Sequence, residues 1–282
     1  MVGFPQRHNG EIMPAYICSA CGTQYPPSER PASVCPVCED ERQYVPPEGQ
    51  SWTTLERLRT THMNGFRQCE PGMIGIGTQP KFAIGQRALL ICTPEGNVLW
   101  DCVSLIDDAT VSVIKALGGL RAIAISHPHF YTTLGEWSRA FGYVPVYLHA
   151  DDAKEVRRPE NCIKYWDGAT LHLQKDITLI RGGGHFAGSS MLHWGAGADG
   201  KGVVCSSDTA MVNLDRKSFT FMRSIPNHIP LPASAVRTIE AALQPFAFDR
   251  VYSHHWERVI PTGAKEILRR SVQRYIAAIG AA

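Results

Sequence analysis

The chain has 282 residues, with 28 lysines and arginines against 26 acidic residues, so its formal net charge is only +2. That balance excludes the broad cationic field on which non-specific nucleic-acid binding depends, and nucleic acid is therefore not an expected partner. The first residues lack the hydrophobic core of a signal peptide, and no later apolar stretch is long enough to cross a bilayer. We expect a soluble, cytoplasmic protein with no membrane partner, whose oligomeric state the sequence leaves open.

Four of the nine cysteines fall in two Cys-x2-Cys pairs, Cys18-Ser-Ala-Cys21 and Cys35-Pro-Val-Cys38, which thirteen residues separate. Each pair has a glycine or proline beside it and predicts a tight knuckle that turns two thiolates inward. Four such thiolates make a closed tetrahedral metal site. The other five cysteines are dispersed, an odd number that argues against a disulfide framework. A segment this short has too little core to fold alone, so bound metal is expected to stabilise it.

The stretch from Tyr16 to Tyr44 resembles the rubredoxin-like module of rubrerythrins and also ordinary zinc ribbons. Zinc is the expected ion, and it would make the module structural or a docking surface for a protein partner. Iron is the alternative, and it would make the module a one-electron relay. The segment Pro46-Pro-Glu-Gly-Gln50 is typical of a linker. We therefore divide the chain into a metal-ribbon module with its linker at 1–50 and a body at 51–282.

Apolar runs and turn residues predict the secondary structure of the body. Short strand-like runs between glycine and proline turns, with Phe82–Ile84 among them, favour an antiparallel meander at 75–103. Further along, Thr133 and Glu136 have the spacing of a capping box at the start of a helix. The remaining predicted elements are a helix at 111–117, strands at 123–125 and 144–148, a helix at 234–243 and a terminal helix at 264–279.

Three apolar runs of the body end in small residues followed by a metal-binding side chain. The first run leads to His127 and His129, the second to His185, and the third to Asp208. Strands that stop at one edge of a sheet deliver their next residues to a common rim, so these side chains are expected to share one metal ion. Side chains alternate along an extended segment, which predicts that the first two histidines lie on one face while Pro128 points away.

From about Gly75 to its C-terminus the sequence resembles the metallo-β-lactamase superfamily. The resemblance is strongest at Ser126-His127-Pro-His129, at Gly184-His185-Phe-Ala-Gly188-Ser189 and at Ser207-Asp208. It implies an α/β fold, an αββα sandwich with the metal site on one edge between two mixed sheets. It also implies that His127, His129 and His185 bind the metal, with Asp208 as the bridging aspartate. The last histidine of the family would be His255 or His254, which follow a fourth apolar run.

The family's His-x-His-x-Asp-His motif is altered here, because Tyr131 and Thr132 stand in place of its last two residues. Those two residues would have been ligands of a second metal, and the ligands that remain are too few to hold one firmly. We therefore predict a single metal ion in the body and a degenerate second site. The phenol of Tyr131 has three candidate roles: it fills the vacated space, bonds to Asp208, or donates to a developing oxyanion as a catalytic residue.

Three histidines around a zinc ion leave a fourth position for a water molecule, whose pKa falls to about 7. The predicted function is therefore hydrolysis of an ester, thioester, amide or phosphoester bond in a small-molecule substrate. Asp208 would orient the nucleophile or accept its proton. Candidate residues at the rim of the site are Tyr131, Phe186, Met222 and Trp256.

Two other functions stay open from the sequence. Two histidines and Asp208 match the facial triad of mononuclear nonheme iron enzymes, so one alternative is an oxygenase that acts on a sulfur substrate, with iron in place of zinc. The superfamily resemblance is compatible with it, because some members use iron in this way. The other alternative is a noncatalytic adaptor, in which the ribbon docks a protein partner and the body keeps a structural metal.

Overall fold

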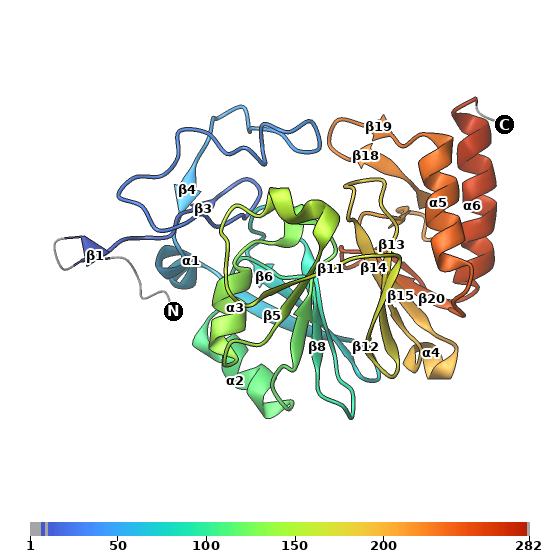
Figure 1. Ribbon diagram of the computed structural model, residues 1–282. Helices are drawn as coiled ribbons and strands as arrows, with labels where there is room; N and C mark the ends of the chain where they lie inside the picture. The colour runs from blue at the N-terminus through green and yellow to red at the C-terminus, as the bar shows by residue number, and fades with distance from the viewer. Residues whose placement is uncertain (1–6, 9–10, 281–282) are drawn as a thin grey trace.

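Two β-sheets packed face to face form the centre of the protein (Figure 1). The computed structural model describes residues 7–8 and 11–280. The first sheet has seven strands, in the spatial order β11 (Ile163–Trp166), β10 (Val146–His149), β9 (Ala122–Ala124), β8 (Val98–Trp100), β7 (Arg87–Ile91), β6 (Met73–Gln79) and β5 (Met63–Glu70). The second has six, in the order β12 (Thr170–Gln174), β13 (Ile177–Arg181), β14 (Ser190–Trp194), β15 (Val203–Cys205), β20 (Arg250–Tyr252) and β21 (Val259–Ile260).

The alternation of side chains along the central strands explains the layered core. On β7, Leu89 and Ile91 point between the two sheets, where Leu192 of β14 and Val203 of β15 belong to the same cluster. The intervening Leu90 belongs instead to the cluster on the outer face of the first sheet. A strand whose two faces are both buried has a continuous run of apolar residues in its sequence. In β7 every residue after Arg87 is apolar.

Helices cover the outer face of each sheet, so the layers are helix, sheet, sheet, helix (Figure 1). The predicted αββα sandwich is confirmed. The first sheet is covered by α1 (Leu55–Thr61), α2 (Asp108–Ala116) and α3 (Leu134–Ala140), and the second by α5 (Ala233–Leu243) and α6 (Ala264–Ala278). Within the described ranges, no helix is long and apolar enough to span a membrane.

The short elements complete the chain. They are β1 (Arg7–His8), β2 (Glu11–Ile12), β3 (Ile17–Cys18), β4 (Trp52–Thr53), the 3₁₀ helices η1 (Pro128–Phe130) and η2 (Ala150–Glu155), α4 (Gly197–Gly200), β16 (Met211–Val212), β17 (Phe219–Thr220), β18 (Met222–Ser224) and β19 (Ile229–Pro230). The strands β3 and β4 pair antiparallel and join the ribbon module to the first residues of the body.

The predicted meander is right in outline but wrong at Phe82–Ile84, which forms a turn instead of a strand. The amide of Gly85 donates to the carbonyl of Phe82 at 3.0 Å, and both Ala83 and Gly85 have positive φ. A chain in the left-handed region cannot continue a strand ladder, so the apolar run ends in a turn. The strand β5, which the apolar pattern did not predict, pairs along its length with β6 and forms the edge of the sheet.

The helix predicted after the histidines is present as α3, but its capping box does not form. The side chain of Thr133 makes no cap hydrogen bond. Its hydroxyl instead donates to the carbonyl of Ser104 at 3.0 Å, while Glu136 forms ion pairs with Arg139 and Arg158. Tertiary partners for both side chains have replaced the local hydrogen bonds that the sequence spacing favours.

Candidate functional site

The four cysteines of the ribbon meet in one buried cluster. Their sulfur atoms lie within 4.8 Å of one another, with Cys18 to Cys38 and Cys21 to Cys35 each at 3.6 Å. A tetrahedral zinc or iron site with metal–sulfur bonds of about 2.3 Å requires sulfur atoms about 3.8 Å apart, so the cluster fits such an ion. Hydrogen bonding with Cys21 lowers the pKa of Cys18 to about 7, which favours a thiolate there.

Two polar side chains support the sulfur atoms from outside the cluster. The amide nitrogen of Gln50 donates to the sulfur of Cys18 at 3.1 Å, and the hydroxyl of Tyr25 lies 3.1 Å from the sulfur of Cys35. Hydrogen bonds to sulfur stabilise thiolates and orient them toward a metal. The four cysteines predicted from the sequence therefore meet in one cluster, and two of them have hydrogen-bond partners that the sequence pattern did not identify.

The body residues predicted to bind metal also converge. His127 and His129 follow β9, His185 follows β13 and Asp208 follows β15, and their ligand atoms lie within 4.8 Å of one another. His185 Nε2 is 3.2 Å from His129 Nδ1, and His127 Nε2 is 3.3 Å from Asp208 Oδ2. The ends of strands from both sheets thus meet at one rim, as expected.

Burial makes this cluster a ready set of metal donors. His127 Nε2 and His129 Nε2 are buried and have no hydrogen-bond partner. Burial lowers the pKa of His185 to about 3 and that of His129 well below its ordinary value, so both imidazoles are neutral at pH 7. Burial alone would raise the pKa of Asp208, but His254 and His127 hold it well below its usual range. Neutral imidazoles and one carboxylate are the donor set that a divalent cation takes.

The first two histidines converge by a different geometry from the predicted one. Residues Pro128–Phe130 form the 3₁₀ turn η1, so the extended segment ends at His127. Within this turn the two imidazoles still approach each other, with ring centroids 5.1 Å apart. The predicted approach of the two imidazoles is confirmed, but the extended backbone predicted for this segment is wrong.

Hydrogen bonds behind the ligands fix the ring orientations. The hydroxyl of Ser126 lies 2.8 Å from His127 Nδ1, and His185 Nδ1 lies 3.2 Å from the carbonyl of Met222. A ring nitrogen facing a carbonyl must carry the proton, which leaves His185 Nε2 with its lone pair toward the cluster. Met222, predicted as a rim residue, thus contributes its backbone.

The structure brings His254, and not His255, to Asp208. His254 Nδ1 lies 2.7 Å from Asp208 Oδ1, and the imidazole is buried. His255 is only partly buried and lies tilted beside His254, with ring centroids 4.0 Å apart. A metal-binding role for either histidine stays a prediction.

The Tyr131 side chain is buried on another side of the loop. It lines a small hollow between the ribbon and the body together with Thr23 and Gln24. Burial, followed by the negative charge of Asp152, raises the pKa of Tyr131 well above its ordinary value, so the phenol stays protonated. Among the described residues no hydrogen bond joins Tyr131 to Asp208, and its catalytic role stays a prediction.

Two buried charged residues of the site were not identified from the sequence. Asp101, with φ of 62°, accepts a hydrogen bond of 2.8 Å from the amide of Ser126, and burial raises its pKa to about 6. Asp101 directly follows β8, so the rule of ligands after strands could have found it. Arg87 donates to the carbonyls of Ser253 and Trp256 and so supports the loop of His254. No local pattern distinguishes Arg87 from an exposed arginine.

The Trp256 side chain, predicted at the rim, packs against a groove of two glycines on β6. A Cβ atom at Gly75 would lie 2.5 Å from the Trp256 ring, and one at Gly77 would lie 2.8 Å from it. We expect Gly75→Ala to displace the indole and lower the free energy of unfolding by about 1–3 kcal/mol, because the added methyl group would overlap the ring and force it off the strand. The matched control is Gly65→Ala on β5, where the nearest atom would be 3.8 Å away. Equal melting temperatures of both variants would contradict this packing role.

Comparison with known proteins gives one clear relative by sequence. No family model matches the chain. The uncharacterized protein YmaE of Bacillus subtilis (strain 168) is 46% identical over 269 residues, which cover 95% of this chain and 97% of YmaE. The likeness therefore includes both the ribbon module and the body.

Solved structures share the fold at low sequence identity. The metallo-β-lactamase FIM-1 from Pseudomonas aeruginosa, in its mono-zinc form, superposes with a TM-score of 0.57 at 14% identity, covering 76% of this chain and 96% of that one. The metallo-β-lactamase DIM-1 gives 0.56 at 14%, covering 76% and 98%, and VMB-1 gives 0.56 at 11%, covering 77% and 98%. The chain thus has the metallo-β-lactamase fold, and it belongs to the same family as YmaE of Bacillus subtilis.

Proposed function

We propose that the protein is a metal-dependent hydrolase with one zinc ion in the body and a second, structural zinc ion in the ribbon. The observation that carries the proposal is the convergence of His127, His129, His185 and Asp208 within 4.8 Å, where the buried Nε2 atom of His127 has no hydrogen-bond partner. A buried polar atom without a partner is costly, and a cation in the cluster would remove that cost. When bound, zinc polarises a substrate oxygen and lowers the pKa of a coordinated water to about 7.

The residues of the chain have distinct parts in this function. Asp208 is the carboxylate nearest the ligand nitrogens and is the candidate to orient the nucleophile or accept its proton. His254 holds Asp208 in place and keeps it ionised. The substrate class is an ester, thioester, amide or phosphoester of a small molecule.

A single ion in the body is part of the proposal. Tyr131 and Thr132 occupy the positions where the superfamily resemblance implies ligands of a second metal, and Tyr131 lines a hollow beside the ribbon. FIM-1, which has the same fold, holds one zinc ion in its mono-zinc form. That observation supports a one-ion site in the metallo-β-lactamase fold.

Elemental analysis of protein purified without added metal tests this proposal. We expect two ions per parent chain, one ion in Cys35→Ser, one ion in His185→Ala, and two in the control His172→Ala, an exposed histidine on β12. The parent should also hydrolyse at least one substrate of an ester, thioester, amide and phosphoester panel, and His185→Ala should not. A parent body with two ions or none would contradict the one-ion site.

The same samples separate the alternative functions. Iron in the body with oxygen uptake in the presence of a thiol substrate would replace the hydrolase by the oxygenase, and a ferric tetrathiolate spectrum would identify iron in the ribbon. Metal-loaded protein that turns over no substrate of the panel, but retains a protein partner through an intact ribbon, would favour the adaptor.

A further inference from the structure

The ribbon module contacts the body next to two loops of the metal site. These ligand loops are the loop after β9, which carries His129, and the loop after β13, which carries His185. The first contact of the module follows the knuckle Cys18–Cys21. The amide of Gln24 donates to the carbonyl of Thr132 at 3.1 Å, and the hydroxyl of Ser104 donates to the carbonyl of Gly22 at 3.0 Å. Gly22 has φ of 82° and leaves no room for a side chain, since a Cβ atom would lie 2.3 Å from that hydroxyl oxygen. The first knuckle is thus fixed to the loop that carries His129.

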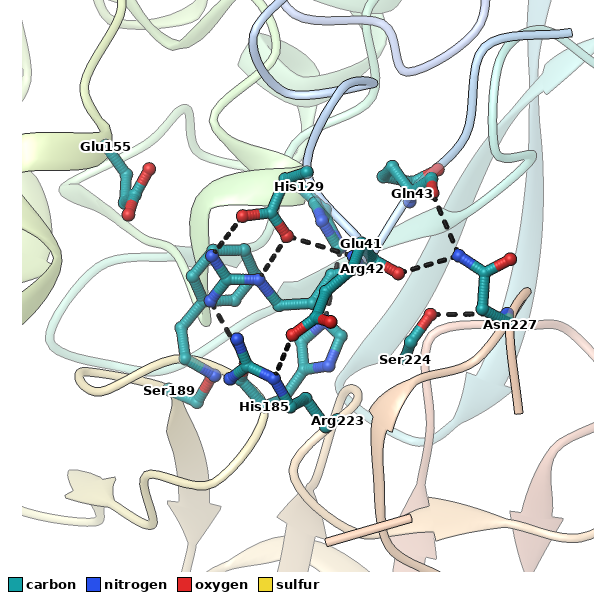
Figure 2. A network of polar contacts seen from close by, with 12 residues as sticks. Glu41, Arg42, Gln43, His129, Glu155, His185, Ser189, Arg223, Ser224 and Asn227 are labelled. Carbon is teal, nitrogen blue, oxygen red and sulfur yellow. Dashed lines mark hydrogen bonds and ion pairs between the residues drawn. The ribbon is translucent and has the colours of Figure 1, made fainter. Parts of the chain in front are cut away.

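The second contact follows the knuckle Cys35–Cys38 and reaches the other ligand loop. Arg42 Nη1 donates to the carbonyl of His185 at 3.3 Å, and its guanidinium lies 3.6 Å from the centre of the Phe186 ring. The Phe186 ring in turn packs against the imidazoles of His129 and His185, with centroids 5.0 and 5.1 Å away. Figure 2 shows Arg42 close to His185.

The orientation of Arg42 is fixed within the ribbon itself. Its Nε and Nη2 donate to the two carboxylate oxygens of Asp40 at 2.6 and 2.7 Å, and only 11% of the Arg42 side chain is exposed. Hydrogen bonding from Arg42 lowers the pKa of Asp40 to about 2, so the carboxylate is charged at neutral pH. A bidentate pair holds the guanidinium plane, which a lysine cannot reproduce.

Neighbouring contacts connect the same ribbon loop to the hairpin of β18 and β19. Glu41 pairs with Arg223, and the side-chain amide of Asn227 donates to the carbonyl of Glu41 at 2.7 Å (Figure 2). This hairpin includes Met222, whose carbonyl faces His185 Nδ1. The ribbon loop therefore supports His185 both through Arg42 and through the hairpin.

We propose that the four-cysteine site holds the two ligand loops at a fixed distance from each other on either side of the body metal site, an arrangement we call the staple. Arg42 is the positioning residue that connects this staple to His185. The His129 loop follows a strand of the first sheet, and the His185 loop follows a strand of the second. One ion bound to both knuckles fixes the distance between them, and each knuckle is attached to one ligand loop. The inference rests on the proposed function in that the body holds an ion.

The rate at which a chelator removes the body metal tests the staple in the full-length protein. We expect Arg42→Ala to release the body ion about tenfold faster or more, because the loss of a group that orients a ligand weakens metal binding by about that factor. Arg42→Lys is expected to resemble Arg42→Ala, since it keeps the charge but loses the bidentate pair. Arg30→Ala, an exposed arginine of the same module, is the control and should match the parent.

A second test measures amide hydrogen exchange in protein whose body site holds no metal. This measurement requires neither a metal ion nor a substrate in the body site. Amides in residues 183–189 should exchange faster in Arg42→Ala and in Cys35→Ser than in the parent and in Arg30→Ala. Arg42→Ala must retain the ribbon ion, which shows that the module is still folded. Parent-like release and exchange in Arg42→Ala would overturn the staple even if the enzyme is active. Faster metal release and faster amide exchange in Arg42→Ala, together with no hydrolysis by the parent, would support the staple and contradict the proposed hydrolase function.

Discussion

Asp208→Asn is expected to weaken zinc binding in the body by at least about 100-fold and to abolish hydrolysis in the substrate panel. Changes to groups that merely support a ligand already cost about 10–100-fold in metal affinity, and Asp208 lies within the ligand cluster itself. An amide keeps the shape of the side chain but carries no negative charge to offset the cation. It also cannot accept a proton from the nucleophile. Zinc competition titrations and panel assays measure the two effects.

The matched control for this change is Asp176→Asn. Asp176 is an exposed aspartate in the turn between β12 and β13 and lies outside the cluster. It should leave both zinc affinity and activity at the parent level. Zinc affinity in Asp208→Asn equal to that of the control would remove Asp208 from the ligand set. Unchanged turnover would remove its proposed role in proton transfer.

Arg87→Leu is expected to lower the free energy of unfolding by about 1–3 kcal/mol and to weaken the His254 loop. Arg87 is 2% exposed, and its guanidinium donates to the carbonyls of Ser253 and Trp256 at 3.1 and 3.3 Å. Burial lowers the pKa of Arg87, which is the physical sign of a desolvated cation. Removing a buried cation recovers desolvation energy, but the Ser253 carbonyl remains and loses its donor, which costs about 1–3 kcal/mol. The Trp256 carbonyl keeps a second donor, Arg67.

Arg67→Leu is the control for Arg87→Leu, since Arg67 also donates to the carbonyl of Trp256, at 3.2 Å. The Arg67 side chain is 53% exposed, so water can replace it, and the variant should lose less than about 1 kcal/mol. Urea unfolding of metal-loaded protein measures both variants. A loss in Arg87→Leu no larger than in Arg67→Leu would show that the buried arginine does not support this loop.

The candidate site could be predicted to a large extent, because its ligands obey a local rule. Each ligand follows an apolar strand, and a strand and its next few residues are specified by nearby sequence. The same rule applied to Asp101 after β8 would have added the carboxylate that fixes the amide of Ser126. The choice between His254 and His255 could not be made in this way, since adjacent residues share every sequence signal and only the turn after β20 selects the one that faces Asp208.

The helix–sheet–sheet–helix layering was implied by the resemblance to the metallo-β-lactamase superfamily. The sequence by itself determined the donor types, the strand that precedes each donor and the four-cysteine motif. These features depend on side-chain chemistry and on short-range periodicity, both of which are local. Only the tertiary structure decided that Arg42 contacts His185 across 143 positions, that a 3₁₀ turn brings the first two histidines together, and that Arg87 supports the His254 loop. Such contacts depend on how separate segments pack against one another, and no local pattern records the surface that a charged side chain will meet.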